Sequence, residues 1–315
     1  LPQFPDLIMF CSDDKDPDDL ILGQINQLVE RALAKGCDLF DVLRAACVNP
    51  VEHYGLDVGL LRVGDPADFI LVEDLRSFKV LANYINGQLV AQEGQSLIQS
   101  IPCPTINNFS TQPKSPADFQ LTAKANHIRV IKALDGEIIT ESFITETPID
   151  QNLAISEPKR DILKIAVINR YSNQAPALAF IHGFGLSQGA IASCVGHDSH
   201  NIIAVGVTDQ AICKAVNLII HHQGGIAACT DQAEMVLPLP IAGILSNDDA
   251  FQVAKDYAAM DAMAKNQLHS SLSAPFMTLS FMGLLVIPEL KLSDLGLFDG
   301  KSFQFIDLFV EEGNK

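Results

Sequence analysis

The spacing of apolar residues divides the first hundred positions into a helical stretch and a stretch of short strands. A continuous apolar run at residues 7–11 predicts a buried strand, and a polar Ser-Asp-Asp turn follows it. Apolar residues then recur every three or four positions, which predicts one helix over residues 16–36 and another over residues 38–49. Between residues 56 and 98 the runs are short and β-rich, and Asn86-Gly87 between two of them is typical of a type I′ hairpin turn.

Residues 99–118 separate this stretch from the rest of the chain. They hold four prolines among serine, threonine and asparagine, which predicts a linker or an extended wrap. Four apolar runs at close intervals from residue 161 onward predict buried strands. Thr208 or Asp209 is expected to cap the helix after them, and residues 225–240 predict a hairpin.

The last part of the chain predicts a further helix and more strands. Asn247 is expected to cap a helix whose apolar face holds Phe251, Ala254, Ala258 and Ala262. The segment "PFMTLSFMGLLVIPELKLSDLGLFD" looks like tight turns and buried strands. Strands and helices are thus mixed along the whole chain, and we expect a mixed α/β (α+β) fold.

Composition narrows the function classes. The chain has 315 residues, 48% of them hydrophobic, so it can bury a large core and is expected to form two or more domains. A net charge of −17 argues against binding nucleic acid, which needs clustered Lys and Arg. The longest apolar run, residues 280–288, is too short to cross a membrane. Seven scattered cysteines without a CxxC pair indicate neither disulfides nor a zinc ribbon, and with no signal peptide we expect a cytoplasmic protein.

Two carboxylates, Asp13 and Asp14, come directly after the first predicted strand. A carboxylate at the carboxyl end of a strand and just before a helix is where barrel enzymes keep catalytic residues. The signal is weak by itself, because an Asp-Asp pair in such a turn is more often a helix cap or a solvated pair.

The segment "HDSHN" is the second candidate for chemistry. His197 and His200, with Asp198 between them and Asn201 after them, could bind a metal or hold a substrate in a polar pocket. The alternative is a pair of hydrogen-bonded structural histidines. Because the segment lies between two apolar strands, we expect it to be partly buried and hydrogen-bonded.

Long stretches of the chain resemble a known family. "FCSDDKDPDDL" and "GLLRVGDPADFILVEDL" are similar to the last β/α unit and the small β-domain of the amidohydrolase superfamily. "GFGLSQGAIASCVGHDSHNIIAVG", "LPLPIAGILS" and "VIPELKLSDLGL" resemble the C-terminal domain of the adenine deaminase family within it. These motifs are long and specific, and the resemblance is weakest between residues 100 and 160.

The resemblance implies a division of the chain into four parts. Residues 1–55 would be the end of an amidohydrolase (β/α)8 barrel, and residues 56–98 would be a small β-domain. Residues 99–160 would be a linker with extended segments, and residues 161–315 would be the C-terminal α/β domain.

The resemblance also implies an activity. Enzymes of this family deaminate adenine to hypoxanthine and ammonia in purine salvage, at a site with a divalent metal that would be manganese, iron or zinc. Asp13 corresponds to the catalytic, metal-binding aspartate, whereas Asp14 and the HDSHN residues would contact substrate or support the site. The family's His-x-His pair is absent from all 315 residues, so most metal ligands would lie outside this chain.

Two functional readings follow from this resemblance. The first is a C-terminal portion of a deaminase that is inactive alone, has the N-terminal barrel portion of the same enzyme as its partner, and forms a homo-oligomer. The second is a non-catalytic purine-binding or regulatory module derived from that domain. The retained Asp13 favours the first reading.

Overall fold

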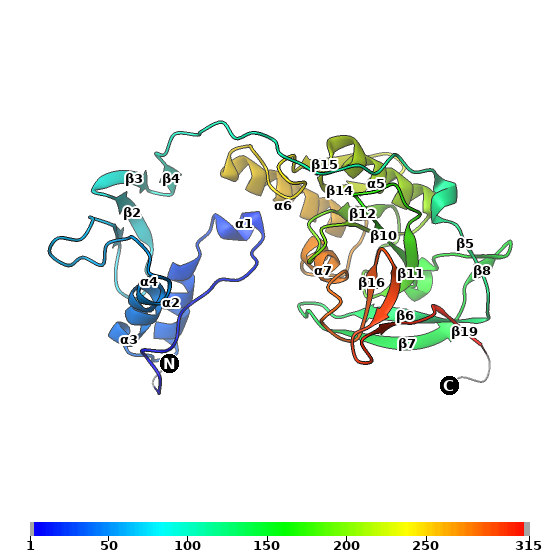
Figure 1. Cartoon of the computed structure of the whole chain (residues 1–315), viewed down its shortest axis with the longest axis horizontal. Helices are drawn as coiled ribbons and strands as arrows, with labels where there is room; N and C mark the ends of the chain where they lie inside the picture. Colours follow the sequence, from blue (N-terminus) through cyan, green and yellow to red (C-terminus); the bar gives the residue numbers. More distant parts are fainter. Residues whose placement is uncertain (1–2, 312–315) are drawn as a thin grey trace. The chain divides into compact units, whose positions relative to one another are not determined.

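The computed structural model describes residues 3–311, and the chain divides into two compact units (Figure 1). Unit 1 comprises residues up to 102 together with 249–254, and unit 2 comprises residues 103–248 and those from 255 onward. No helix within residues 3–311 has the length and apolar character that a membrane span requires.

Unit 1 begins with helices. Gly23, with a φ of +144°, interrupts the single helix expected over residues 16–36 and leaves a one-turn helix before a longer one. Asp38 caps the next helix as expected, because its carboxylate accepts hydrogen bonds from the backbone N–H groups of Phe40 and Asp41. The helical elements are α1 (Pro17–Leu20), α2 (Ile25–Ala34), α3 (Leu39–Leu43), a π-helical turn (Arg44–Val48) and α4 (Asn49–Tyr54).

The strand expected at residues 7–11 does not form. Leu7 lies in a turn, where its N–H donates to the Phe4 carbonyl at 3.1 Å, and residues 8–11 are irregular. No strand among the described residues pairs with this segment, and Leu7 is 79% exposed. The Phe10 N–H donates instead to the carbonyl of Ala45, at 3.1 Å. A strand needs a hydrogen-bonding neighbour, so an apolar run without one does not form a strand.

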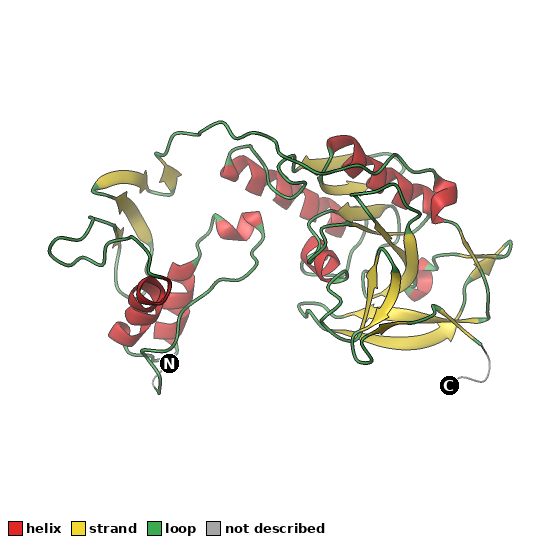
Figure 2. Ribbon diagram, viewed as in Figure 1, coloured by secondary structure: helices red, strands yellow, loops and turns green. Residues whose placement is uncertain are grey.

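A small antiparallel sheet completes unit 1 (Figure 2). Asn86 and Gly87 both have positive φ, +50° and +75°, which confirms the type I′ turn. Phe78 packs with Val29 and Val42 of the helices in one small core. The strands, in spatial order, are β1 (Phe69–Val72), β2 (Val80–Ile85), β3 (Gln88–Gln92) and β4 (Gln95–Ser96).

Unit 2 is built on a nine-stranded sheet with the order β15-β14-β12-β13-β10-β11-β6-β19, and β7 pairs with the other side of β6. All pairs are antiparallel except β6 with β11. The four buried strands expected from residue 161 onward are β10 to β13. The strands of the sheet are β6 (His127–Ala133), β7 (Thr140–Glu146), β10 (Leu163–Ile168), β11 (Ala177–His182), β12 (Ala190–Ser193), β13 (Ile202–Gly206), β14 (Gly225–Cys229), β15 (Glu234–Pro238) and β19 (Phe309–Val310).

Two three-stranded sheets and several helices accompany the large sheet. One small sheet has the order β5-β9-β8 and the other β16-β17-β18. Their strands are β5 (Leu121–Thr122), β8 (Ile149–Asp150), β9 (Leu153–Ala154), β16 (Leu290–Ser293), β17 (Gly296–Asp299) and β18 (Gln304–Phe305). The helices are α5 (Asp209–His222), α6 (Ala250–Asn266), α7 (Pro275–Phe281) and two short 3₁₀ turns (Pro116–Phe119 and Pro158–Arg160).

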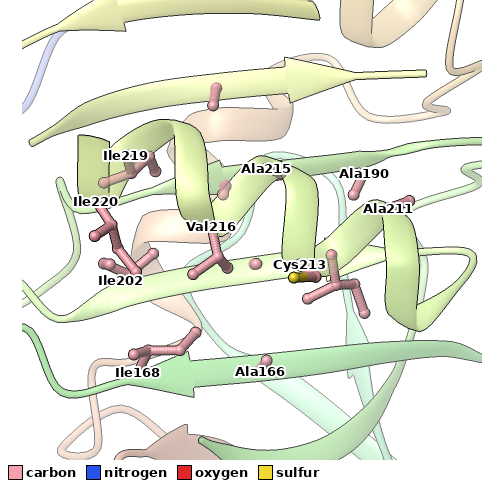
Figure 3. Packing of buried hydrophobic residues seen from close by; sticks show 14 of the residues in the cluster. Ala166, Ile168, Ala190, Ile202, Ala211, Cys213, Ala215, Val216, Ile219 and Ile220 are labelled. Atoms are coloured by element: carbon pink, nitrogen blue, oxygen red, sulfur yellow. The ribbon is translucent and has the colours of Figure 1, made fainter. Parts of the chain in front are cut away.

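Helix α5 covers one face of the sheet, and its apolar side forms the main core with β10, β12, β13 and β14 (Figure 3). The Thr208 hydroxyl accepts from the Ala211 N–H at 3.1 Å, so Thr208 is the cap. The residues of this core that Figure 3 labels include Ile168, Ile202, Val216, Ile219 and Ile220.

The last part of the chain departs from the predictions in three ways. Asp249, not Asn247, caps α6, because its carboxylate accepts from the N–H groups of Phe251 and Gln252. Of the predicted apolar face of α6, Ala254 is buried, Ala258 is half-buried, and Phe251 and Ala262 are exposed. The other buried residues of the helix are Tyr257, Met260, Met263 and Ala264. Residues 275–281 form helix α7, and the strands expected there begin only at β16.

The proline-rich segment is extended, as expected. Within unit 2 it runs along the domain surface, where the N–H groups of Ser110 and Thr111 both donate to the Arg170 carbonyl, at 2.7 and 3.1 Å.

The helices and sheets of the two units confirm the mixed α/β class. A barrel unit is not seen among residues 3–311.

Candidate functional site

Asp13 lies just after the apolar segment 7–11, with a φ of +56°. Its carboxylate is exposed and accepts a hydrogen bond from the backbone N–H of Asp14, at 2.9 Å. Asp14 is exposed as well. Neither residue caps α1, because Asp16 occupies the N-cap position. The alternative interpretation of this pair as a helix cap is therefore wrong.

A metal site needs several ligands, and Asp13 could supply at most one. Within residues 3–311, no three or more side chains of His, Cys, Asp or Glu gather closely enough to hold a metal ion. Three or four protein ligands are usual for a catalytic zinc, so the described residues do not fit a complete metal centre. No catalytic step can be derived through a metal from these residues.

The HDSHN segment, residues 197–201, forms the loop that joins β12 to β13. His197 is half-buried, and its ring stacks on Phe281 of α7 with centroids 4.5 Å apart. Its backbone N–H donates to the carbonyl of Ser280 at 3.1 Å. Asp198 is exposed at the tip of the loop. The first half of the loop is thus anchored on α7.

His200 occupies the second half of the loop in a left-handed conformation, with a φ of +52°. Its backbone N–H donates to the Gly196 carbonyl at 2.8 Å, which closes the loop. The ring Nδ1 is buried and has no hydrogen-bond partner among the described atoms. Burial lowers the pKa of His200, the nearby Arg170 guanidinium and His197 lower it further, and Asp198 opposes the change. The imidazole is therefore neutral at pH 7.

Asn201 ends the loop and is 3% exposed. Its Oδ1 accepts a hydrogen bond from the backbone N–H of Arg170, at 3.2 Å. The neighbouring Tyr171 hydroxyl donates to the carbonyl of Ser199 at 2.8 Å. The loop after β10 thus joins the HDSHN loop, and both lie at one end of neighbouring strands of the sheet.

Sequence reasoning missed Arg170 and Tyr171. The one sequence signal was an arginine two residues after a strand whose six residues are all buried, where a charged side chain needs a specific reason. The structure brings His197, His200 and Asn201 together in one loop. Asp13 and Asp14 belong to the other unit.

This loop can offer polar contacts to a planar heterocycle. A neutral imidazole carries one donor and one acceptor, and His200, whose backbone is anchored in a half-buried loop, presents such groups in a fixed geometry. As expected from the sequence, the segment is partly buried and hydrogen-bonded.

Comparison with known proteins gives a consistent result. The family described as "Adenine deaminase C-terminal domain" matches residues 137–304, and the "Amidohydrolase family" matches residues 5–90. A protein of Sulfurovum sp. named adenine deaminase is 57% identical over 307 residues, which are 98% of this chain and 56% of that protein. A protein of the same name in Salinibacter ruber is 52% identical, over 99% of this chain and 57% of that protein. Another in Methanosarcina acetivorans is 45% identical, over 99% of this chain and 58% of that protein. The chain therefore spans little more than half the length of the curated relatives it matches.

Proposed function

Because this chain belongs to the adenine deaminase family, we propose that it is the C-terminal portion of a deaminase that converts adenine and water to hypoxanthine and ammonia. The observation that carries the proposal is the match of nearly the whole chain to relatives of that name. The activity would serve purine salvage in the cytoplasm, and the assembled enzyme would be a homo-oligomer. Hydrolysis of an amidine C–N bond is the reaction class.

Asp13 is our candidate for the catalytic carboxylate and for one ligand of a manganese, iron or zinc ion. It follows an apolar segment within the amidohydrolase match, and its exposed side chain accepts from the Asp14 N–H. One carboxylate cannot hold the ion, so the other ligands would come from a part of the enzyme outside residues 3–311. When bound, such an ion supplies a nucleophilic hydroxide at neutral pH. Asp14 would support this turn.

The apolar surface of unit 1 supports the proposal that a further part of the enzyme binds there. Leu7, Phe40 and Leu61 are all more than two-thirds exposed, although they are large and apolar. An open groove of about 470 Å³ runs between α2 and the small sheet, lined by residues that include Val29 and Phe78. Exposed apolar area of this extent marks an interaction surface. We propose that the N-terminal barrel portion of the same enzyme covers it.

The HDSHN loop is our candidate for contacts to the substrate. Adenine is planar and carries ring nitrogens and an exocyclic amine, which a neutral imidazole or an amide can recognise. His197, His200 and Asn201 are held by backbone bonds and stacking, whereas Asp198 is free to turn toward a ligand at the loop tip. A rigid polar loop of this kind favours binding one orientation of the base.

The test joins this chain to the N-terminal portion of the Sulfurovum relative and measures ammonia released from adenine with manganese, iron or zinc added. We expect turnover by the joined enzyme and none above background by the 315-residue chain alone. Asp13→Asn should lower turnover roughly 10³-fold or more with an unchanged melting temperature, since an exposed carboxylate contributes little to packing. The matched control is Asp19→Asn, an exposed carboxylate in α1.

Three results would count against these assignments. Near-normal turnover of Asp13→Asn would remove Asp13 from the reaction. Ammonia release by the chain alone would show that it holds a complete site. A folded joined enzyme that binds adenine without turnover would favour the purine-binding module.

A further inference from the structure

Arg170 is buried beside the HDSHN loop at the end of β10, with only 5% of its surface exposed. An arginine is rarely buried to this extent without a specific arrangement of acceptors around it. Its Nη1 donates to the carbonyl of Ala242 at 2.7 Å, and its Nη2 donates to the Tyr171 hydroxyl at 3.0 Å. The guanidinium therefore links the loop after β10 to the turn after β15.

The space for this guanidinium depends on a glycine. A Cβ atom at Gly243 would lie 1.9 Å from Arg170 Nη1, and Gly243 has a φ of +76°. The residue after Ala242 must therefore be small and left-handed for the arginine to reach the Ala242 carbonyl. The backbone at Gly243 is therefore shaped to admit the end of the Arg170 side chain.

Tyr171 carries the connection from Arg170 to the HDSHN loop. The guanidinium carbon lies 4.8 Å from the centre of the Tyr171 ring, in a cation–π contact. The Tyr171 hydroxyl accepts from Arg170 Nη2 and donates to the Ser199 carbonyl at 2.8 Å. The Arg170 backbone N–H reaches Asn201 Oδ1 in addition. The two residues on either side of His200 are thus both tied to the Arg170-Tyr171 pair.

We propose that Arg170 and Tyr171 are positioning residues that fix the HDSHN loop, and with it the His200 ring, in the conformation that receives the substrate. The role in substrate binding rests on the proposed function. The role in holding the loop rests on the contacts alone. Because Tyr171 is more than one-third exposed, its hydroxyl contributes to the shape of the loop more than to the core.

The first experiment removes the Tyr171 hydroxyl, which joins Arg170 to the Ser199 carbonyl, without disturbing packing. In the 315-residue chain carrying Tyr171→Phe, we expect the amide of His200, which donates to the Gly196 carbonyl, to exchange with deuterium about five- to tenfold faster. Amides of β10 and β13 should exchange at the wild-type rate. The control is Tyr54→Phe, which removes an exposed hydroxyl from unit 1 and should leave the His200 amide unchanged. An unchanged His200 amide in Tyr171→Phe, or equal acceleration throughout the sheet, overturns the proposal.

The second experiment separates positioning from stability in the joined enzyme. Tyr171→Phe should raise KM for adenine about five- to tenfold, with a smaller effect on kcat and a melting temperature near that of the wild type. A lowered melting temperature with unchanged KM would make Tyr171 merely structural and overturn the proposal. If the His200 amide is loosened while KM and kcat stay at wild-type values, the loop is positioned as proposed but does not serve the substrate. That result overturns the role proposed above for HDSHN and leaves the positioning assignment standing.

Discussion

Lys291 offers a prediction with a definite sign. It lies within β16 with none of its surface exposed, and its Nζ donates to the Ile138 carbonyl at 2.8 Å. No carboxylate of the described residues pairs with it, and burial lowers its pKa from 10.5 to about 8. A buried ammonium without an opposite charge destabilises the fold, so Lys291→Met should stabilise unit 2.

The pKa gives the magnitude. A fall from 10.5 to about 8 means that the charged lysine costs about 3 kcal/mol of folding free energy at neutral pH. Methionine has a similar length and no charge, but it leaves the Ile138 carbonyl without its donor, at a cost of about 1 kcal/mol. The net gain at pH 7 should be about 2 kcal/mol. The folded pKa lies below the unfolded one, so the wild-type penalty is complete below pH 8 and disappears as the pH rises to 10.5.

Urea unfolding followed by circular dichroism, at pH 7 and at pH 10, measures both effects. The wild type should gain stability between the two values relative to Lys291→Met. The matched control is Lys164→Met, since Lys164 is equally buried but pairs with Asp209 at 2.5 Å and with the Phe119 carbonyl at 2.8 Å. Removing that lysine leaves the Asp209 carboxylate without its partner and should lower the free energy of unfolding by about 3 kcal/mol. Loss of stability in Lys291→Met at pH 7, with no pH dependence in the wild type, would refute the reasoning.

Two further predictions concern local structure and the open surface of unit 1. Thr208→Ala removes the hydroxyl that caps α5 and should lower the stability of unit 2 by about 1 kcal/mol in the same unfolding assay. Thr208→Ser keeps the hydroxyl and should keep the stability. Equal losses in both variants would show that the hydroxyl does not cap α5. The 315-residue chain should bind the dye ANS through the exposed apolar surface of unit 1, and joining the N-terminal portion of the relative should abolish most of that fluorescence; undiminished fluorescence would mean that the surface has no such partner.

The sequence predicted unit 2 better than unit 1, for a physical reason. Strands β10, β12 and β13 are buried at every position and β11 over its central residues, so each contains a run of adjacent apolar residues that differs from the three- or four-residue spacing of a surface helix. Thr208 and the apolar spacing after it marked α5 from its own residues. Segment 275–281 misled the prediction because a short apolar run fits a buried helix as well as a buried strand.

The polar site was predictable only in part. The HDSHN loop was visible because its five residues are contiguous, and its place between two apolar strands required burial. Arg170 and Tyr171 were not, because their partners Ser199 and Asn201 lie 28 and 31 residues away in sequence. Only the antiparallel pairing of β10 with β13 brings them together. Side-chain contacts that depend on strand pairing cannot be derived from local patterns.

The failed strand at residues 7–11 has a different meaning from the other errors. Its pattern is that of a strand buried on both faces, yet Leu7 lies exposed in a turn, residues 8–11 are irregular, and the Phe10 N–H donates to Ala45. Nothing in the segment disfavours a strand; what it lacks among the described residues is a neighbour. The same unit leaves large apolar residues on its surface, whereas the core of unit 2 is closed by α5. Both features have one explanation if a further part of the enzyme supplies the neighbouring strand, and pairing beside residues 7–11 would then also fix the turn that carries Asp13.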